Sequence, residues 1–258
     1  MSPILAGLLG SLVAGLGTAV GALPIFIRET WSKGAQSLML AVSGGVMLSA
    51  TFFSLLLPGL DLARIRAGTE LAAVLTVSGG VVLGALTLWL LHAFTPHEHF
   101  EKGREGSTAF HPGRNWLFVL AIALHNLPEG LSVGVAYGAG TPVSTGHSVT
   151  LGIALQNLPE GLAVAAALLH DGMPRGRAFA IALLTGLVEP LGGLLGAFAV
   201  SLSGALLPWG LAFAAGSMLF VVSGEILPET HREGTERRAT FAMVLGFVGM
   251  MAIARLVG

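Results

Sequence analysis

Long apolar segments, separated by short polar stretches, recur along the whole of the 258-residue chain. A membrane-spanning helix needs about 20 consecutive, mostly apolar residues, and by that measure the pattern predicts eight spans. Their predicted bounds are 3–27, 34–58, 70–93, 115–138, 147–170, 176–202, 205–228 and 238–257. The chain is therefore predicted to be an all-α, polytopic membrane protein made of a single transmembrane domain.

The composition agrees with this prediction. Hydrophobic residues make up 53% of the chain and charged residues only 10%, whereas soluble domains carry about 25% charged residues. The net charge of −1 gives no reason to expect a nucleic-acid partner, and the absence of cysteine excludes thiolate metal ligands and cysteine nucleophiles. The first apolar segment lacks a positively charged start, so it is expected to be retained as a helix in the bilayer.

Lysine and arginine residues gather in alternate loops. Ten of the 13 lie in the loops after the first, third, fifth and seventh spans, which the positive-inside rule assigns to the cytoplasm. Both termini are then predicted to face outward from the cell (inner or plasma) membrane. The longest of these loops, 94–114, contains His97, His99 and His111. It is predicted to be either a solvated, flexible segment or a low-affinity metal-collecting loop.

Two nearly identical stretches place the fourth and fifth spans in register. LAIALHNLPEGLSVGVA begins at Leu120, and LGIALQNLPEGLAVAAA begins 31 residues later at Leu151. A weaker similarity, at an offset of 171, links GLGTAVG (15–21) with GLVEPLG (186–192). Because consecutive spans run in opposite directions, the pattern predicts a 3+2+3 inverted-repeat bundle. Transporters are commonly built in this way, with the substrate site near the middle of the bilayer.

Carboxylates interrupt three of the predicted spans, at Glu129, Glu160 and Glu189. A charged side chain at the bilayer centre costs about 2.5–3.5 kcal/mol on insertion scales, and no lysine or arginine is predicted at the same depth. Either protonation or a bound divalent cation would remove this cost. In HNLPEG, His125 and Asn126 precede Glu129 by four and three residues, so the three side chains share one helical face.

The second copy, QNLPEG, repeats the pattern with Gln156, Asn157 and Glu160. Imidazole, amide and carboxylate groups together form a ligand set that suits Zn²⁺, Fe²⁺, Mn²⁺ or Cd²⁺, and carboxylates from two helices can bridge a pair of metals. Pro128 and Pro159 lack the N–H that would bond to the carbonyl four residues back. Each helix is therefore predicted to kink at its motif.

Other polar or soft side chains have simpler interpretations when they are taken singly. Met47 is interpreted as a packing residue. Glu225, near the cytoplasmic end of the seventh span, is either a solvated charge at a helix end or part of a polar path. Three histidines near span ends are interpreted as interfacial residues: His92, His147 and His170.

The paired motifs resemble those of the ZIP (Zrt/Irt-like) family of divalent metal transporters, in its bacterial GufA-like branch. By this resemblance the main transport site is formed by His125, Glu129, Gln156 and Glu160. A neighbouring second site is formed by Asn126, Glu129, Asn157, Glu160 and Glu189. The resemblance also implies that Met47 is an additional ligand, that Glu225, His97 and His99 lie on the cytoplasmic exit route, and that the protein is a homodimer. Gln156 departs from the family pattern, since many members have histidine there.

The expected function is therefore transport of a divalent transition metal into the cytoplasm, by alternating access through an intramembrane site between the fourth and fifth spans. Zinc is the expected substrate, with cadmium, iron and manganese as further candidates, and the protein is expected not to be an enzyme. Two alternatives remain open at this stage. One is an intramembrane metal-dependent hydrolase, although HNLPEG differs from the His-Glu-x-x-His zinc-protease pattern. The other is a metal-gated channel.

Overall fold

The computed structural model describes the backbone of residues 1–28, 32–94, 97–99, 103–105, 114–138, 143–170, 172–231 and 236–257. Side chains are described within these ranges except at 33, 97–99, 103–105, 114–122 and 257. All structural statements below refer to these residues.

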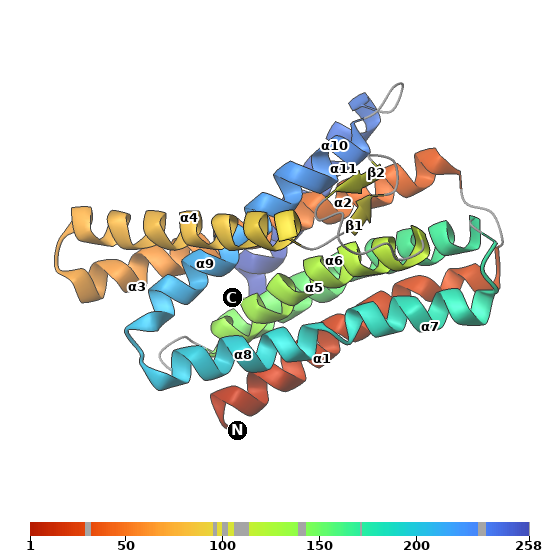
Figure 1. Ribbon diagram of the computed structural model, residues 1–258. Helices are drawn as coiled ribbons and strands as arrows, with labels where there is room; N and C mark the ends of the chain where they lie inside the picture. The colour runs from red at the N-terminus through yellow and green to blue at the C-terminus, as the bar shows by residue number, and fades with distance from the viewer. Residues whose placement is uncertain are drawn as a thin grey trace.

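Apart from one short hairpin, the described chain is helical (Figure 1). Its elements are α1 (Pro3–Ala22), the 3₁₀ turn η1 (Leu23–Phe26), α2 (Lys33–Ala50), the π-helix η2 (Thr51–Leu56), α3 (Leu57–Ala67), α4 (Glu70–Phe94), β1 (His97–His99), β2 (Gly103–Glu105), α5 (Arg114–Ala136), α6 (Val143–His170), α7 (Arg175–Gly186), α8 (Glu189–Leu202), α9 (Leu206–Val221), the π-helix η3 (Val222–Ile226), α10 (Leu227–Thr230) and α11 (Glu236–Val257).

Within the described chain, seven helical stretches are long and apolar enough to cross a membrane. They are Pro3–Phe26, Gly34–Ala67, Glu70–Phe94, Val143–His170, Arg175–Leu202, Leu206–Thr230 and Glu236–Leu256. The protein is thus a multi-pass membrane protein. Helix α5 occupies the position of the remaining predicted span, 115–138, but its side chains are described only from Ala123 onward.

The second span was predicted over residues 34–58, but the helix in the structure extends beyond residue 58. The helix continues through η2 and α3 to Ala67, where Gly68 adopts a left-handed conformation with φ of 70° and ends it. Pro58 does not stop the helix because it occupies the first turn of α3, directly after the wider turn of η2. A proline is tolerated at that position because its missing N–H is not needed there. The predicted outer loop is correspondingly shorter.

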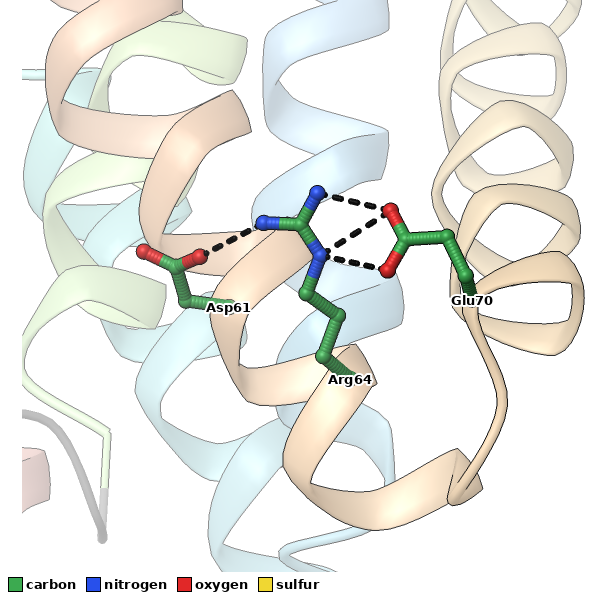
Figure 2. Close-up of polar contacts among 3 residues, drawn as sticks. All are labelled: Asp61, Arg64 and Glu70. Atoms are coloured by element: carbon green, nitrogen blue, oxygen red, sulfur yellow. Dashed lines mark hydrogen bonds and ion pairs between the residues drawn. The ribbon is translucent and has the colours of Figure 1, made fainter.

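Arg64 closes the turn between α3 and α4, as Figure 2 shows. Its guanidinium donates to both carboxylate oxygens of Glu70, with Nε at 2.8 Å from Oε2 and Nη2 at 2.7 Å from Oε1. Another bond, of 3.1 Å, joins Nη1 to Asp61 Oδ1. The three side chains are exposed, so they join the helix ends at the surface and lie outside the buried core.

A short break divides the sixth predicted span, 176–202. Helix α7 ends at Gly186 and α8 begins at Glu189, with Pro190 in its first turn. The break puts the Glu189 carboxylate at a helix N-terminus, where the helix dipole favours negative charge. The predicted span ran through this position without a break, because a proline within an apolar helix is compatible with a kink as well as with an interruption.

Two groups of helices enclose α5 and α6. In Figure 1, α5 and α6 (green) run side by side, with α1, α7 and α8 along one side and α2, α3, α4, α9 and α10 along the other. Helix α1 packs against α6 and α8, and α8 packs against α5, while α2 packs against α11 and α4 against α9. The largest buried apolar cluster includes Ala14 on α1, Met47 on α2, Val133 on α5, Ile153 on α6 and Met218 on α9, so it joins both groups to the central pair.

The predicted loop 94–114 is not entirely irregular. Strands β1 and β2 pair in antiparallel fashion, with His97 opposite Glu105 and His99 opposite Gly103, and β1 lies against α5. The side chains of His97 and His99, and all of His111, lie outside the described residues. Ligation by these histidines therefore stays a prediction.

Candidate metal site

The two motif copies face each other on α5 and α6. Pro128 and Pro159 lie inside these helices, and the helical pattern continues through both of them. The helices can pack closely around the motifs because a glycine follows each glutamate. A Cβ at Gly130 would come within 2.6 Å of Glu189 Cα, and a Cβ at Gly161 within 2.9 Å of Thr18 Cα. Larger residues would push α8 and α1 away from the motifs.

The polar residues of both motifs, and Glu189, are removed from solvent. Six of them are exposed by 7% or less: Asn126, Glu129, Gln156, Asn157, Glu160 and Glu189. Glu129 interacts electrostatically with both Glu160 and Glu189. Three carboxylates therefore converge inside the bundle, and none of the salt bridges found in the described chain joins them to lysine or arginine.

Amide side chains of the second motif orient two of these carboxylates. Gln156 Nε2 donates to Glu129 Oε1 at 2.5 Å, which links α6 to α5. Asn157 Nδ2 donates to Glu189 Oε1 at 2.6 Å and to the Ala14 carbonyl at 2.8 Å, which links α6 to α8 and α1. The site is thus held together by side chains from α5, α6 and α8 and by a backbone carbonyl of α1.

Many ligand atoms of the cluster have no protein partner. Among the described residues, the buried atoms without a hydrogen bond include Glu129 Oε2, Gln156 Oε1, Asn157 Oδ1, Glu160 Oε1, Glu189 Oε2 and both amide atoms of Asn126. Leaving a buried polar group unsatisfied costs about 1–3 kcal/mol, and more for a charged group. All but one of these atoms are oxygens with lone pairs to offer, which is the arrangement that a divalent cation requires.

A second cluster lies beside the first, around Glu225 in η3. Glu225 Oε2 is paired with His125 Nε2, and Glu225 Oε1 lies 3.3 Å from His92 Nδ1. One ligand atom from each of the three residues lies within 4.8 Å of the others. Because His125 also interacts electrostatically with Glu160, it connects the carboxylate cluster to this one.

Two interpretations from sequence were wrong here. His92 was taken as an interfacial residue, yet it is only 8% exposed and lies beside Glu225. Glu225 is 6% exposed, which rules out the solvated helix end. The sequence carries no local signal for this pair, because His92 on α4 and Glu225 in η3 meet only through the packing of α4 against α9.

Met47 is buried on the α2 face that meets α6. It is 1% exposed and lies one helical turn after Ser43, whose hydroxyl donates to the Gln156 carbonyl at 3.1 Å. The residue also belongs to the main apolar cluster, so packing accounts for part of its role. His147 and His170 lie exposed at the two ends of α6.

The sequence of this chain matches a family model described as "ZIP Zinc transporter" over residues 91–254. The chain is 49% identical over 247 residues to the zinc transporter GufA of Myxococcus xanthus, covering 94% of this chain and 95% of that protein. It is 45% identical to the zinc transporter ZIPB of Bordetella bronchiseptica, over 97% of this chain and 81% of that protein. It is also 32% identical to the zinc transporter ZIP11 of Bos taurus, over 98% of this chain and 97% of that protein.

Proposed function

Since the chain belongs to the ZIP family of zinc transporters, we propose that it carries Zn²⁺ into the cytoplasm through the carboxylate cluster between α5 and α6. The observation that supports this most directly is the set of buried oxygen atoms without protein partners at Glu129, Glu160 and Glu189. Membership of a transporter family decides against the intramembrane hydrolase considered above.

The cluster can accommodate two cations that share carboxylates. We assign His125, Glu129, Gln156 and Glu160 to the main transport site. The second site consists of Asn126, Glu129, Asn157, Glu160 and Glu189, and its geometry is supported by the bond from Asn157 to Glu189. Met47 is assigned as an additional ligand on the α2 side, because it lies one turn from the contact between Ser43 and Gln156.

We assign metal release to the cluster around Glu225. A cation bound at Glu160 would next meet His125, which interacts electrostatically with Glu160 and is paired with Glu225. It would then reach the group formed by His92, His125 and Glu225. From there His97 and His99 would receive it, because β1 lies against α5. Imidazole groups and a single carboxylate bind zinc well. They carry less negative charge than the three-carboxylate cluster, and this weaker attraction favours release of the cation toward the cytoplasm.

The proposed architecture has eight spans in a 3+2+3 inverted repeat with both termini outside. Packing supports it: α1 lies against α6 as α8 lies against α5, and α2 lies against α11 as α9 lies against α4. At the atomic level, Gly161 meets Thr18 and Gly130 meets Glu189. The two glycines are 31 residues apart and their partners 171 apart, which are the two repeat offsets. The π-helices η2 and η3 also begin 171 residues apart, at Thr51 and Val222.

The proposed mechanism is alternating access. The helices α1, α5, α6 and the α7–α8 pair form one packed group, and α2–α3, α4, α9–α10 and α11 form another. Sliding of the first group against the second would expose the site to one side of the membrane and then to the other. A homodimer in the cell membrane is the proposed assembly.

Uptake by purified protein in proteoliposomes tests this proposal. Saturable accumulation of radiolabelled Zn²⁺ in sealed vesicles, released by an ionophore, is the expected result. Flux that rises linearly with zinc concentration would favour the metal-gated channel instead. Unlabelled Cd²⁺, Fe²⁺ and Mn²⁺ as competitors would then rank the other proposed substrates, whose ligand preferences overlap with those of zinc.

A further inference from the structure

Thr18 is a fully buried residue of α1 whose hydroxyl has no hydrogen-bond partner among the described residues. A threonine inside a helix commonly donates to a carbonyl three or four residues back, as Thr51 and Thr230 do here. For Thr18 the carbonyl four residues back is that of Ala14, and this carbonyl accepts a hydrogen bond from Asn157 instead. The Thr18 hydroxyl is therefore withheld from its own helix.

The surroundings of Thr18 belong to the carboxylate cluster. A Cβ at Gly161, the residue after Glu160, would come within 2.9 Å of Thr18 Cα. A Cβ at Gly186, three residues before Glu189, would come within 3.0 Å of Thr18 Oγ1. Thr18 thus lies between the helix that carries Glu160 and the α7–α8 break that presents Glu189, with its backbone against Gly161 and its hydroxyl beside Gly186.

Thr18 is also the counterpart of Glu189 in the repeat. The two residues are 171 positions apart, and each lies against the glycine that ends one motif copy, Gly161 or Gly130. The position on α8 therefore carries a carboxylate, while the equivalent position on α1 carries a neutral hydroxyl. This difference is a second asymmetry in the site, besides His125 and Gln156.

We propose that Thr18 is a further metal-binding residue, whose hydroxyl supplies a neutral oxygen ligand to the divalent cation held by Glu160 and Glu189. This inference rests on the proposed function and adds α1 to the helices that bind metal. A hydroxyl adds an oxygen donor without adding charge, which suits a cluster that already contains three carboxylates. Neutral oxygen donors, such as carbonyls and waters, commonly complete the coordination of divalent cations that carboxylates hold.

Two conservative variants test the role of the hydroxyl. Thr18→Val removes the oxygen and keeps the branched shape, whereas Thr18→Ser keeps the oxygen and removes a methyl group. Equilibrium dialysis of the detergent-solubilised full chain against radiolabelled Zn²⁺ measures affinity and stoichiometry directly. We expect Thr18→Val to bind zinc about three- to tenfold more weakly, which corresponds to up to about 1.4 kcal/mol of binding free energy. Thr18→Ser should stay within twofold of the natural protein.

Melting temperature, measured without metal, is the control for packing. It should be the same for Thr18→Val and the natural protein. If Thr18→Val binds zinc as the natural protein does, or if Thr18→Ser weakens binding equally, the hydroxyl is not a ligand and the inference is overturned. Failure of the proposed function is distinguishable, because it would appear as absent zinc accumulation by the natural protein in proteoliposomes.

Discussion

Gln156 on α6 donates a 2.5 Å hydrogen bond to the Glu129 carboxylate on α5, so the residue that differs between the two motif copies bonds directly to the opposite copy. His125 is at the equivalent position in the first copy and is paired with Glu225 instead. One copy therefore points its variable residue into the carboxylate cluster, and the other points it toward the cluster around Glu225.

Gln156→His is predicted to increase the preference for zinc over manganese. The change adds a second imidazole, a ligand that suits zinc, whereas manganese prefers oxygen donors. We expect a shift of up to about tenfold, or about 1.4 kcal/mol, in the ratio of inhibition constants of Mn²⁺ and Zn²⁺. Competition against radiolabelled zinc uptake measures it, with Gln156→Asn as the variant that keeps an amide. An unchanged ratio would show that Gln156 does not contact the transported ion.

Glu129→Ala and Glu160→Ala are each predicted to nearly abolish zinc uptake while the protein still inserts into the membrane. Removing one partner of a buried, charged binding contact costs about 2–5 kcal/mol of binding free energy, which corresponds to roughly thirtyfold or more in affinity. Radiolabelled zinc uptake, normalised to the protein in the membrane, measures the loss. Asp61→Ala is the matched control, since Asp61 is an exposed carboxylate paired with Arg64. Normal uptake by Glu129→Ala would refute the site assignment.

His92→Ala is predicted to slow metal release more than metal capture. His92 lies beside Glu225, away from the three-carboxylate cluster, so the maximal uptake rate should fall several-fold with little change in KM. Initial rates over a range of zinc concentrations separate the two parameters. His170→Ala, at the exposed end of α6, serves as the control. A rise in KM without a fall in maximal rate would instead assign His92 to metal capture.

Gly161→Ala is predicted to destabilise the protein. The added Cβ would lie 2.7 Å from the Thr18 carbonyl carbon, and overpacking of this kind costs about 1–3 kcal/mol. Thermal unfolding in detergent should show a melting temperature lower by several degrees. Gly176→Ala, on α7, meets no atom within 4 Å and should melt at or above the natural temperature. Equal melting of both variants would mean that α1 and α6 do not pack this closely.

Deleting residues 97–105 is predicted to reduce the uptake rate only modestly, about twofold or less. The transported ion is expected to be bound mainly by the buried cluster, whose residues lie on α5, α6 and α8. Replacement of the same residues by a Gly-Ser linker of equal length controls for the shortened connection. Complete loss of uptake in both variants would mean that the loop histidines are essential.

The membrane-spanning helices and the arrangement of polar side chains on single helical faces could be predicted without a structure. The helices could be anticipated because a backbone in the bilayer must satisfy its own hydrogen bonds, which makes every long apolar segment helical. The faces of HNLPEG and QNLPEG were equally predictable, since residues three and four apart share a helical face. The break before Glu189 and the extension of the second span to Ala67 were not, because Pro190 and Pro58 are each compatible with an interruption and with a continuing helix.

The sequence by itself therefore determined the helical membrane fold, the placement of Glu129 and Glu160 on helical faces with amide and imidazole groups, and membership of a transporter family. Only the tertiary structure placed His92 beside Glu225 and Thr18 beside the helices that carry Glu160 and Glu189. Both are single polar residues without a motif, on α4 and α1. Their environment depends on which helices pack together, and helix packing joins residues more than a hundred positions apart. The spacing of residues along one helix carries no information about such contacts, because it predicts only which side chains of that same helix lie on one face.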